Sequence, residues 1–231
     1  MNTHKKCIVL LSGGLDSSVN LFEAHTALKV ELVLTFDYGQ RAARREIRTA
    51  EYLCNKLGLK HKAITVPFFK DFTQTSLVNE KAELPTGKLV NINDFKNCVE
   101  TAKKVWVPNR NGIFINIAAG FAENMGVDYV VVGFNVEEAQ TFPDNTQEFL
   151  DAVEKSLSYS TGNHVKMKCF TTRKNKTEIV RRAWELGINL EELWPCYVST
   201  EKWCGQCESC MRFDRAIKDA KAFKVFRDLE I

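Results

Sequence analysis

The residues with the clearest chemical potential form a short turn near the start of the chain, Ser-Gly-Gly-Leu-Asp-Ser at 12–17. An apolar run, Cys7–Leu11, precedes it, and an amphipathic segment follows. A strand that ends in glycines and opens into a helix directs backbone N–H groups and the positive end of a helix dipole to one point. The turn lacks the Gly-Lys-Ser/Thr ending of a Walker loop, so it offers no lysine to a terminal phosphate. We therefore expect a pyrophosphate site for chemistry at an α-phosphate; the alternative is a glycine turn before a serine-capped helix.

A second group of chemically capable residues lies near the other end of the sequence. Four of the eight cysteines follow the pattern Cys-x7-Cys-x2-Cys-x2-Cys, namely Cys196, Cys204, Cys207 and Cys210. Thiolates at this spacing can surround one tetrahedral ion, which favours zinc, with an iron–sulfur cluster as the competing interpretation. The remaining cysteines are scattered and fit small apolar core positions, and the histidines form no cluster.

The elements that must position these residues alternate between apolar, β-branched runs and helical patterns. Strands are expected at 6–11, 30–36, 61–66, 128–134 and 164–170, and helices at 16–28, 41–57, 112–125, 147–158 and 176–186. This rhythm predicts an α/β protein with a doubly wound, mainly parallel sheet. Ligands of such sheets bind outside the carboxyl ends of the strands, so the polar residues after the strands should share one crevice. Residues 68–104 lack periodicity and should form a lid or an irregular excursion.

Length, composition and charge exclude several classes of protein. A chain of 231 residues suits a nucleotide-binding domain over 1–190 with a zinc-binding segment and terminal helix over 191–231. No apolar run approaches the roughly 20 residues of a membrane span, and the residues at 1–6 carry no signal-peptide core, so we expect a cytoplasmic protein. A formal net charge of +3 is too small to indicate a stable nucleic-acid complex.

Several motifs, in order along nearly the whole chain, resemble those of one family. Ser-Gly-Gly-x-Asp-Ser is the signature of the PP-loop ATP pyrophosphatases. Phe-Asp-Tyr-Gly-Gln-Arg at 36–41, Val-Pro-Asn-Arg-Asn at 107–111, Phe-Pro-Asp at 142–144 and the four cysteines follow it. Together these motifs resemble the 7-cyano-7-deazaguanine synthase family of the queuosine pathway. The resemblance implies an adenine-nucleotide α-hydrolase-like fold, a zinc site at the cysteines and a homodimer.

The resemblance also implies an ATP-dependent ligase that makes a nitrile from 7-carboxy-7-deazaguanine and ammonia. ATP converts the carboxylate into an acyl adenylate, ammonia gives the amide, and a second activation lets AMP leave as the nitrile forms. Each activation displaces pyrophosphate, whose charge glycine N–H groups, cations and Mg²⁺ can stabilise. Because the sequence contains no glutaminase-like segment, ammonia should be free or delivered by a partner.

Roles for individual residues follow from the same resemblance. The residues expected to bind ATP are Ser12, Gly13, Gly14, Leu15, Asp16, Ser17, Ser18, Asp37 and Gln40. Those expected to be catalytic are Asp16, acting through Mg²⁺, Arg110 and Lys176. Those expected to contact the deazaguanine substrate are Arg110, Asn111, Glu138, Phe142 and Asp144. The residue types alone leave open a loop-stabilising arginine, a solvated lysine, and helix caps at Asp37 and Gln40.

The segment 138–146 departs from the family pattern. Members commonly read Asp-x-Ser-Gly-Tyr-Pro-Asp-Cys-Arg there, whereas this chain reads Glu-Ala-Gln-Thr-Phe-Pro-Asp-Asn-Thr. Glu138 replaces the first aspartate and can accept hydrogen bonds from the amidine edge of a guanine-like base. The departure favours one alternative, a related ligase that passes the acyl group to a protein or another amine without making the nitrile. Two others stay open on separate grounds: a zinc-ribbon protein that binds tRNA, and a PP-loop enzyme that thiolates tRNA.

Overall fold

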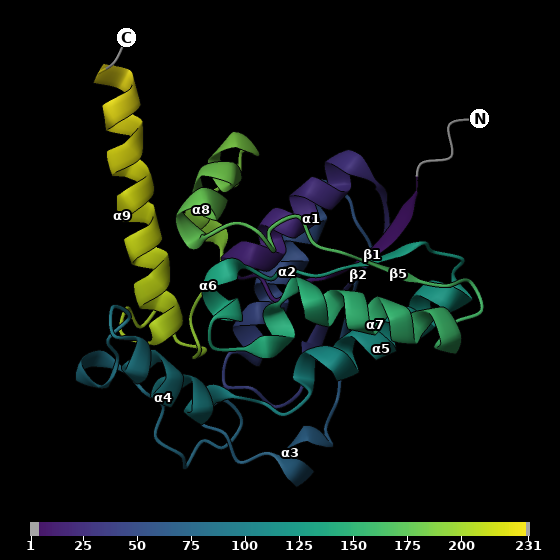
Figure 1. The fold of residues 1–231 in the computed structure, drawn as a ribbon, viewed down its shortest axis with the longest axis horizontal. Helices are drawn as coiled ribbons and strands as arrows, with labels where there is room; N and C mark the ends of the chain where they lie inside the picture. The colour runs from purple at the N-terminus through teal and green to yellow at the C-terminus, as the bar shows by residue number, and fades with distance from the viewer. Residues whose placement is uncertain (1–4, 230–231) are drawn as a thin grey trace.

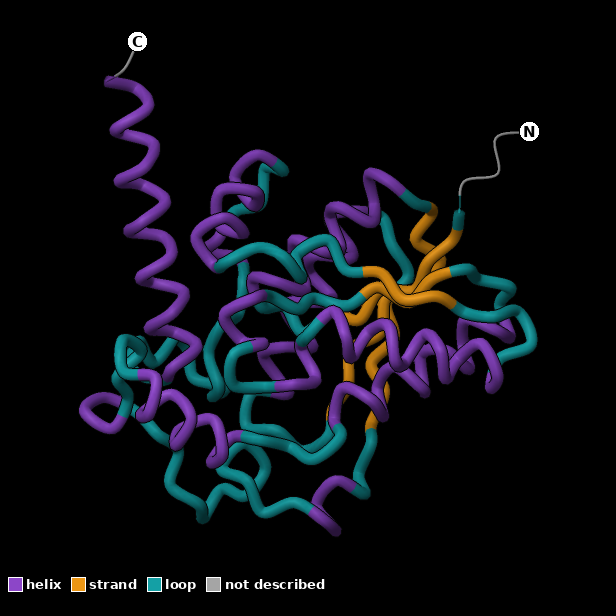
Figure 2. Tube along the Cα trace, in the orientation of Figure 1, coloured by secondary structure: helices purple, strands orange, loops and turns teal. Residues whose placement is uncertain are grey.

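Five parallel strands form one sheet at the centre of the molecule (Figures 1 and 2). The computed structural model describes residues 5–229, without side chains from 223 onward. Residues 1–4 and 230–231, at the outer ends of the two predicted domains, lie outside the described residues. The strands are β1 (Lys6–Leu10), β2 (Lys29–Asp37), β3 (His61–Thr65), β4 (Tyr129–Val131) and β5 (Lys166–Lys168).

The order of the strands, β3-β2-β1-β4-β5, creates a switch point beside β1. The chain runs from β1 outward to β2 and β3, then returns to β4 on the other side of β1. Val9 of β1 consequently lies opposite Val33 on one side and Val131 on the other. Ligands of doubly wound sheets bind at the carboxyl ends of the strands next to such a point.

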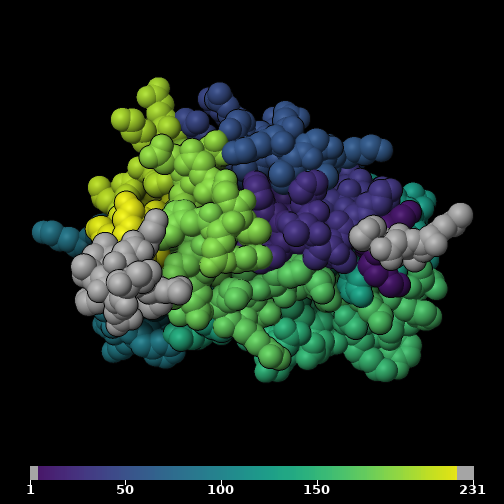
Figure 3. All heavy atoms as spheres, turned by 90° about the horizontal axis from the view of Figure 1, so that it is seen from above, coloured from purple at the N-terminus to yellow at the C-terminus, as the bar shows by residue number. Residues whose placement is uncertain are grey.

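Helices cover both faces of the sheet, which confirms the α/β fold class predicted from the sequence (Figure 2). Over one face pack α1 (Leu15–Ala27), α2 (Ala43–Leu57) and α8 (Lys176–Glu185), with α9 (Glu208–Leu229) packed on α8; over the other pack α5 (Arg110–Asn124) and α7 (Gln147–Ser160). Strand alternation explains the two cores, because Cys7 and Val9 belong to the first and Ile8 to the second. Seen from above, α8 lies between α1 and α9 (Figure 3).

Turn and cap residues end the helices where their chemistry predicts. Gly58 follows α2 with φ 66°, a left-handed conformation in which a β-carbon is unfavourable. Asn175 and Glu178 form the predicted capping box at the start of α8. Among the described helices, none combines the length and the apolar character that a membrane crossing requires.

The segment 68–104 is more ordered than its sequence suggested. It contains α3 (Phe69–Phe72), the 3₁₀ turn η1 (Gly87–Leu89) and most of α4 (Phe95–Val105). Buried Cys98, Ala102 and Val105 give α4 an apolar face at a helical spacing, which polar runs on both sides concealed. The expectation of an irregular excursion was therefore wrong for α4.

The connections after β4 also hold short helical turns rather than the predicted loop. These are α6 (Val136–Ala139) and η2 (Pro143–Asn145), while η3 (Leu190–Glu192) precedes the cysteine segment. Asn135 begins α6 by accepting hydrogen bonds from the N–H groups of Glu137 and Glu138, each at 3.0 Å. This cap fixes the direction in which the two glutamates leave the sheet.

Candidate active site

A cavity of about 260 Å³ opens at the carboxyl ends of β1, β2 and β4. Its wall includes the turn at 12–17, the end of β2, the start of α5, the segment 132–145 and residues 194–197. It therefore lies at the switch point, where the fold predicts a ligand. Most of the residues that the sequence singled out converge on this one place.

The turn at 12–17 has the geometry of an anion cradle. Gly13 has φ +77°, and a β-carbon there would lie 2.7 Å from Thr49, so only glycine fits. Gly14 is the N-cap of α1 and supplies no side-chain cap, which leaves the first N–H groups of the helix available to an anion. The hydroxyl oxygens of Ser12 and Ser17 lie 3.1 Å apart, and the N–H of Trp194 donates to the carbonyl of Gly13 at 2.8 Å.

Gly133, which the sequence analysis missed, follows β4 and lets the end of this strand approach the cradle closely. A β-carbon on this residue would lie 2.5 Å from the backbone nitrogen of Ser17. Any side chain would thus displace the start of α1. The signal was a glycine inside a strongly β-branched run, which often marks a close approach of two backbones.

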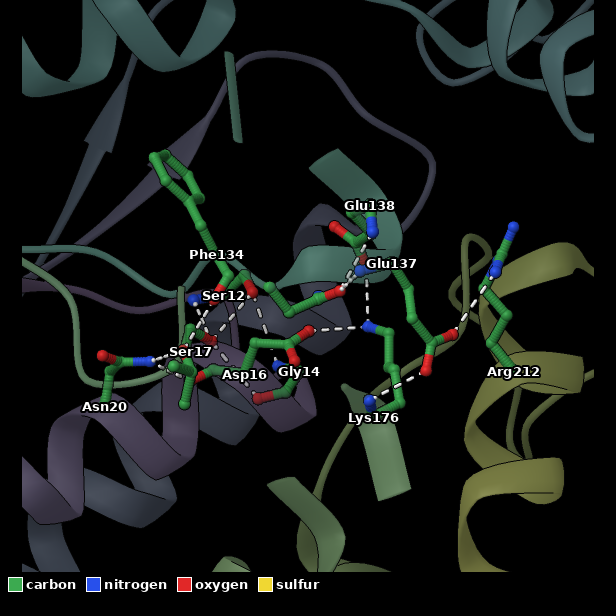
Figure 4. Close-up of polar contacts among 12 residues, drawn as sticks. Ser12, Gly14, Asp16, Ser17, Asn20, Phe134, Glu137, Glu138, Lys176 and Arg212 are labelled. Carbon is green, nitrogen blue, oxygen red and sulfur yellow. Dashed lines mark hydrogen bonds and ion pairs between the residues drawn. The ribbon is translucent and has the colours of Figure 1, made fainter. Parts of the chain in front are cut away.

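Lys176 joins the cradle to the segment after β4 (Figure 4). Its Nζ lies 2.6 Å from Asp16 Oδ2 and 2.6 Å from Glu138 Oε1, and the residue is 4% exposed. Burial alone would lower the pKa of Lys176, but the attraction of the two carboxylates outweighs it and holds the pKa above its ordinary value. The ammonium group is therefore a fixed positive charge at the cavity wall.

Asp16 retains an unused carboxylate oxygen. Its Oδ1 is buried and accepts no hydrogen bond from any described residue, while Oδ2 contacts Lys176. A buried acceptor without a partner is costly unless a ligand completes it. A carboxylate oxygen beside an anion cradle is the type of ligand that Mg²⁺ accepts together with phosphate oxygens, so the residues fit this ion.

Glu137 and Arg212, which the sequence analysis also missed, form hydrogen bonds that hold this arrangement in place. Glu137 accepts hydrogen bonds from the N–H of Lys176 at 2.9 Å, from Arg215 at 2.6 Å and from Arg212 at 3.4 Å (Figure 4). Arg212 also donates twice to Glu208, at 2.9 and 2.8 Å. These hydrogen bonds therefore connect α6 and α8 to α9 and orient Lys176.

The residues expected to contact the deazaguanine also lie in the cavity wall. Arg110 points toward Tyr38, with Nη1 3.4 Å from the phenolic oxygen and the guanidinium 6.0 Å from the ring centroid. Asn111 donates to the carbonyl of Asp144 at 3.4 Å, and Phe142 stacks on Trp106 with 5.9 Å between centroids. The full predicted set, Arg110, Asn111, Glu138, Phe142 and Asp144, lines the cavity.

Four predicted nucleotide contacts lie outside the described cavity wall: Gly13, Ser18, Asp37 and Gln40. Asp37 accepts from the N–H of Gly39 at 3.0 Å, and Gln40 donates to the carbonyl of Phe36 at 2.9 Å while accepting from Tyr38. Both side chains thus stabilise the turn after β2. Neither caps the following helix, because the N-cap of α2 is Ala42 and receives no side-chain hydrogen bond. The other predicted contacts, Ser12, Gly14, Leu15, Asp16 and Ser17, line the cavity.

The four cysteines gather into one cluster beside the cavity. The Sγ atoms of Cys196, Cys204, Cys207 and Cys210 all lie within 4.8 Å of one another. Zn–S bonds of about 2.3 Å in a tetrahedron separate the sulfurs by about 3.8 Å, so the cluster could hold a metal ion with little movement. The N–H groups of Cys204 and Cys207 point at cluster sulfurs at 3.4 and 3.3 Å, which stabilises thiolates.

Comparisons with known proteins agree with this arrangement. The family model "Queuosine biosynthesis protein QueC" matches residues 6–221. A curated 7-cyano-7-deazaguanine synthase of Bdellovibrio bacteriovorus is 52% identical, over 95% of this chain and 96% of its own. Those of Carboxydothermus hydrogenoformans and Methanosarcina mazei are 48% and 46% identical, over 92% and 93% of this chain and 98% and 94% of theirs. The chain, whose motifs already resembled that family, belongs to the family of queuosine biosynthesis protein QueC.

Proposed function

We propose that this protein converts 7-carboxy-7-deazaguanine, ammonia and ATP into 7-cyano-7-deazaguanine for queuosine biosynthesis. The relatives' names and the match of the family model over residues 6–221 support the activity. The observation that carries the proposal is the position of Lys176, whose ammonium bridges Asp16 of the phosphate turn and Glu138 of the substrate segment in one cavity. Activation and substrate binding can therefore occur side by side.

At the phosphate end, the turn at 12–17 binds the triphosphate through the N-terminus of α1. Asp16 would hold Mg²⁺ through its unpartnered oxygen, and the ion would offset the charge of the leaving pyrophosphate. Lys176 adds a second positive charge that is already fixed before reaction, so little reorganisation is needed as charge develops. A carboxylate oxygen of the substrate attacks the α-phosphorus, and the bond to pyrophosphate breaks.

At the substrate end, Arg110, Asn111 and Asp144 line the same part of the cavity, where Asn111 donates to the backbone carbonyl of Asp144. Arg110 provides a cation for the substrate carboxylate and for the α-phosphate that joins it. Phe142 offers an aromatic surface to a purine-like ring, and the carboxylates of Glu138 and Asp144 can accept hydrogen bonds from its amino and ring N–H groups. We therefore expect the reacting carboxylate of the substrate to bind between Arg110 and Lys176.

The cysteine cluster serves as a structural zinc site in this proposal. All four thiolates are committed to the ion, so no coordination position remains for a substrate. Cys196 also lines the cavity beside Trp194, which means that the bound ion would fix part of the wall. A cytoplasmic location, expected from the sequence, and a homodimer, expected from the family resemblance, complete the proposal.

The proposal is tested by incubating the purified protein with 7-carboxy-7-deazaguanine, ATP, Mg²⁺ and ammonium. We expect pyrophosphate release that depends on the carboxylate substrate, followed by a product with the mass of the nitrile. Pyrophosphate exchange without ammonium would isolate the first adenylation. Absence of substrate-dependent exchange would refute the proposed activation.

A further inference from the structure

Glu46 is a carboxylate of the cavity wall to which neither the sequence nor the proposed function gives a role. It lies in the first turn of α2, next to Tyr38 and Arg110 in the wall. Its backbone carbonyl approaches the cradle, since a β-carbon on Gly13 would lie 3.4 Å from it. The backbone of Glu46 is therefore close to the phosphate turn, and its side chain lies near Arg110 and Tyr38 in the cavity wall.

The hydrogen bonds of Glu46 leave it able to take up a proton. Oε2 accepts from the amide of Gln40 at 2.8 Å, and Oε1 makes no hydrogen bond to any described residue. Gln40 is itself fixed by the carbonyl of Phe36 and the N–H of Tyr38, so it holds the carboxylate in one orientation. One oxygen of this cavity-lining residue is anchored, and the other is left without a hydrogen bond to the described residues.

The other carboxylates of the described cavity wall are already engaged. Asp16 and Glu138 contact Lys176 at 2.6 Å, and Glu208 pairs with Arg212 at 2.8 Å. Asp144 accepts from Asn145 at 3.0 Å and belongs to the proposed substrate contacts. Glu46 makes no ion pair within 4.0 Å among the described residues, so its proton affinity is not fixed by a paired cation.

The surroundings of Glu46 suit a group that exchanges protons near neutral pH. Burial raises the pKa of Glu46 to about 7, against the opposing effects of the Gln40 hydrogen bond and the Arg110 charge. The charged and titratable groups that face it are Arg110 from α5, and Asp37 and Tyr38 from the end of β2. A carboxylate with this affinity accepts a proton from a reacting nitrogen and returns it to water readily.

We propose that Glu46 is the base that removes protons from the nitrogen in both halves of the reaction, an inference that rests on the proposed function. When ammonia attacks the acyl adenylate, the C–N bond forms, one nitrogen proton passes to Glu46, and the C–O bond to AMP breaks. The adenylated amide carries two nitrogen protons, which must leave as the C≡N bond forms and AMP departs. Glu46 accepts them in turn and releases them to solvent.

The test compares Glu46→Gln, which keeps the Gln40 hydrogen bond, with Glu51→Gln, an exposed position on the same helix. Pyrophosphate exchange with the carboxylate substrate alone should be unchanged in both variants. Formation of the amide and the nitrile should fall by about 100-fold or more in Glu46→Gln only, the usual effect of losing a general base. Glu46→Asp should restore part of the rate, and thermal unfolding checks that each variant is folded.

A pH profile adds a readout that a structural role would not change. Hydroxylamine replaces ammonia, because its nitrogen is unprotonated at neutral pH. The wild-type rate should rise through about pH 7 and then level, and Glu46→Gln should lack this rise. Normal amination by Glu46→Gln, or an equal loss of exchange and amination, would overturn the inference. A wild-type protein without exchange would instead refute the proposed function.

Discussion

At the scale of single residues, the site depends on one buried cation shared by two carboxylates. Lys176 is 4% exposed and lies 2.6 Å from both Asp16 and Glu138. Burying the ammonium of Lys176 and the carboxylate of Asp16 is expensive unless the geometry is good, so such a group is weak evidence for stability and better evidence for function. Because Lys176 lies between the phosphate turn and the substrate segment, its positive charge can stabilise the negative charge that develops during activation.

Asp16→Ala is expected to abolish nearly all pyrophosphate release while the fold survives. The variant removes the unpartnered oxygen proposed to bind Mg²⁺, but Lys176 keeps Glu138 as its partner. Pyrophosphate release and thermal unfolding measure the two effects. Asp71→Ala, at an exposed position of α3, is the matched control. Unchanged pyrophosphate release in Asp16→Ala would remove this residue from the site.

The raised pKa of Glu46 predicts a pH-dependent cost in stability. Between its ordinary value of 4.5 and about 7, the folded protein keeps a proton that the unfolded chain has lost. The free energy of unfolding therefore falls as pH rises through this window and levels above it. Glu46→Gln lacks this titration, so its stability relative to wild type should increase by about 2 kcal/mol from about pH 5 to about pH 8. The free energies of unfolding of both proteins are measured by denaturant titration at each pH. A difference between them that stays constant with pH would contradict the assignment.

At the scale of elements, the cradle exists because β4 and α1 approach each other closely. Gly133→Ala places a β-carbon 2.5 Å from backbone atoms of α1, which cannot move aside as a flexible side chain can. We expect a loss of about 1–3 kcal/mol in stability and weaker ATP binding, measured by unfolding and calorimetry.

Gly120→Ala is the control for this change. Gly120 lies within α5, and a β-carbon there would meet nothing within 4 Å. It should raise stability by about 1 kcal/mol and leave ATP binding unchanged. Equal behaviour of the two variants would show that the contact between β4 and α1 does not shape the cradle.

The elements were largely predictable from the sequence because their signals are local. Apolar runs, Gly58 and the Asn175–Glu178 pair indicated strands and helix ends near their observed positions. The α4 helix was missed because its apolar face is narrow. The contacts between Lys176 and Asp16, 160 positions apart, and between Glu137 and Arg212, 75 apart, depend on tertiary packing that no local pattern encodes.

At the scale of the whole molecule, the cysteine segment connects distant parts of the chain. Thr86 pairs with Cys207, and the N–H of Gly87 donates to Gln206 at 2.9 Å, so the segment around η1 is attached to the cluster. Cys196, which belongs to the same cluster, lines the cavity together with Trp194. The proposed zinc ion would thus stabilise both the cavity wall and the segment that follows α3.

Removal of the metal should therefore affect stability and ligand binding together. We expect one zinc ion per chain by elemental analysis, and a chelator or Cys207→Ser should lower the melting temperature by about 10 °C or more. ATP binding should weaken in the same samples. Cys54→Ser, in the core and away from the cluster, is the control: it should lower stability without changing the metal content. A protein that binds ATP equally well without metal would contradict this coupling.

The central claim is that one cavity activates first a carboxylate and then the amide made from it. The most direct measurement supplies the protein with the amide intermediate, ATP and Mg²⁺, without ammonium, and follows the product by mass spectrometry. The account predicts the nitrile, with pyrophosphate released in step. An amide that stays unchanged, while the carboxylate is still adenylated, would contradict it and indicate a ligase that ends at the amide.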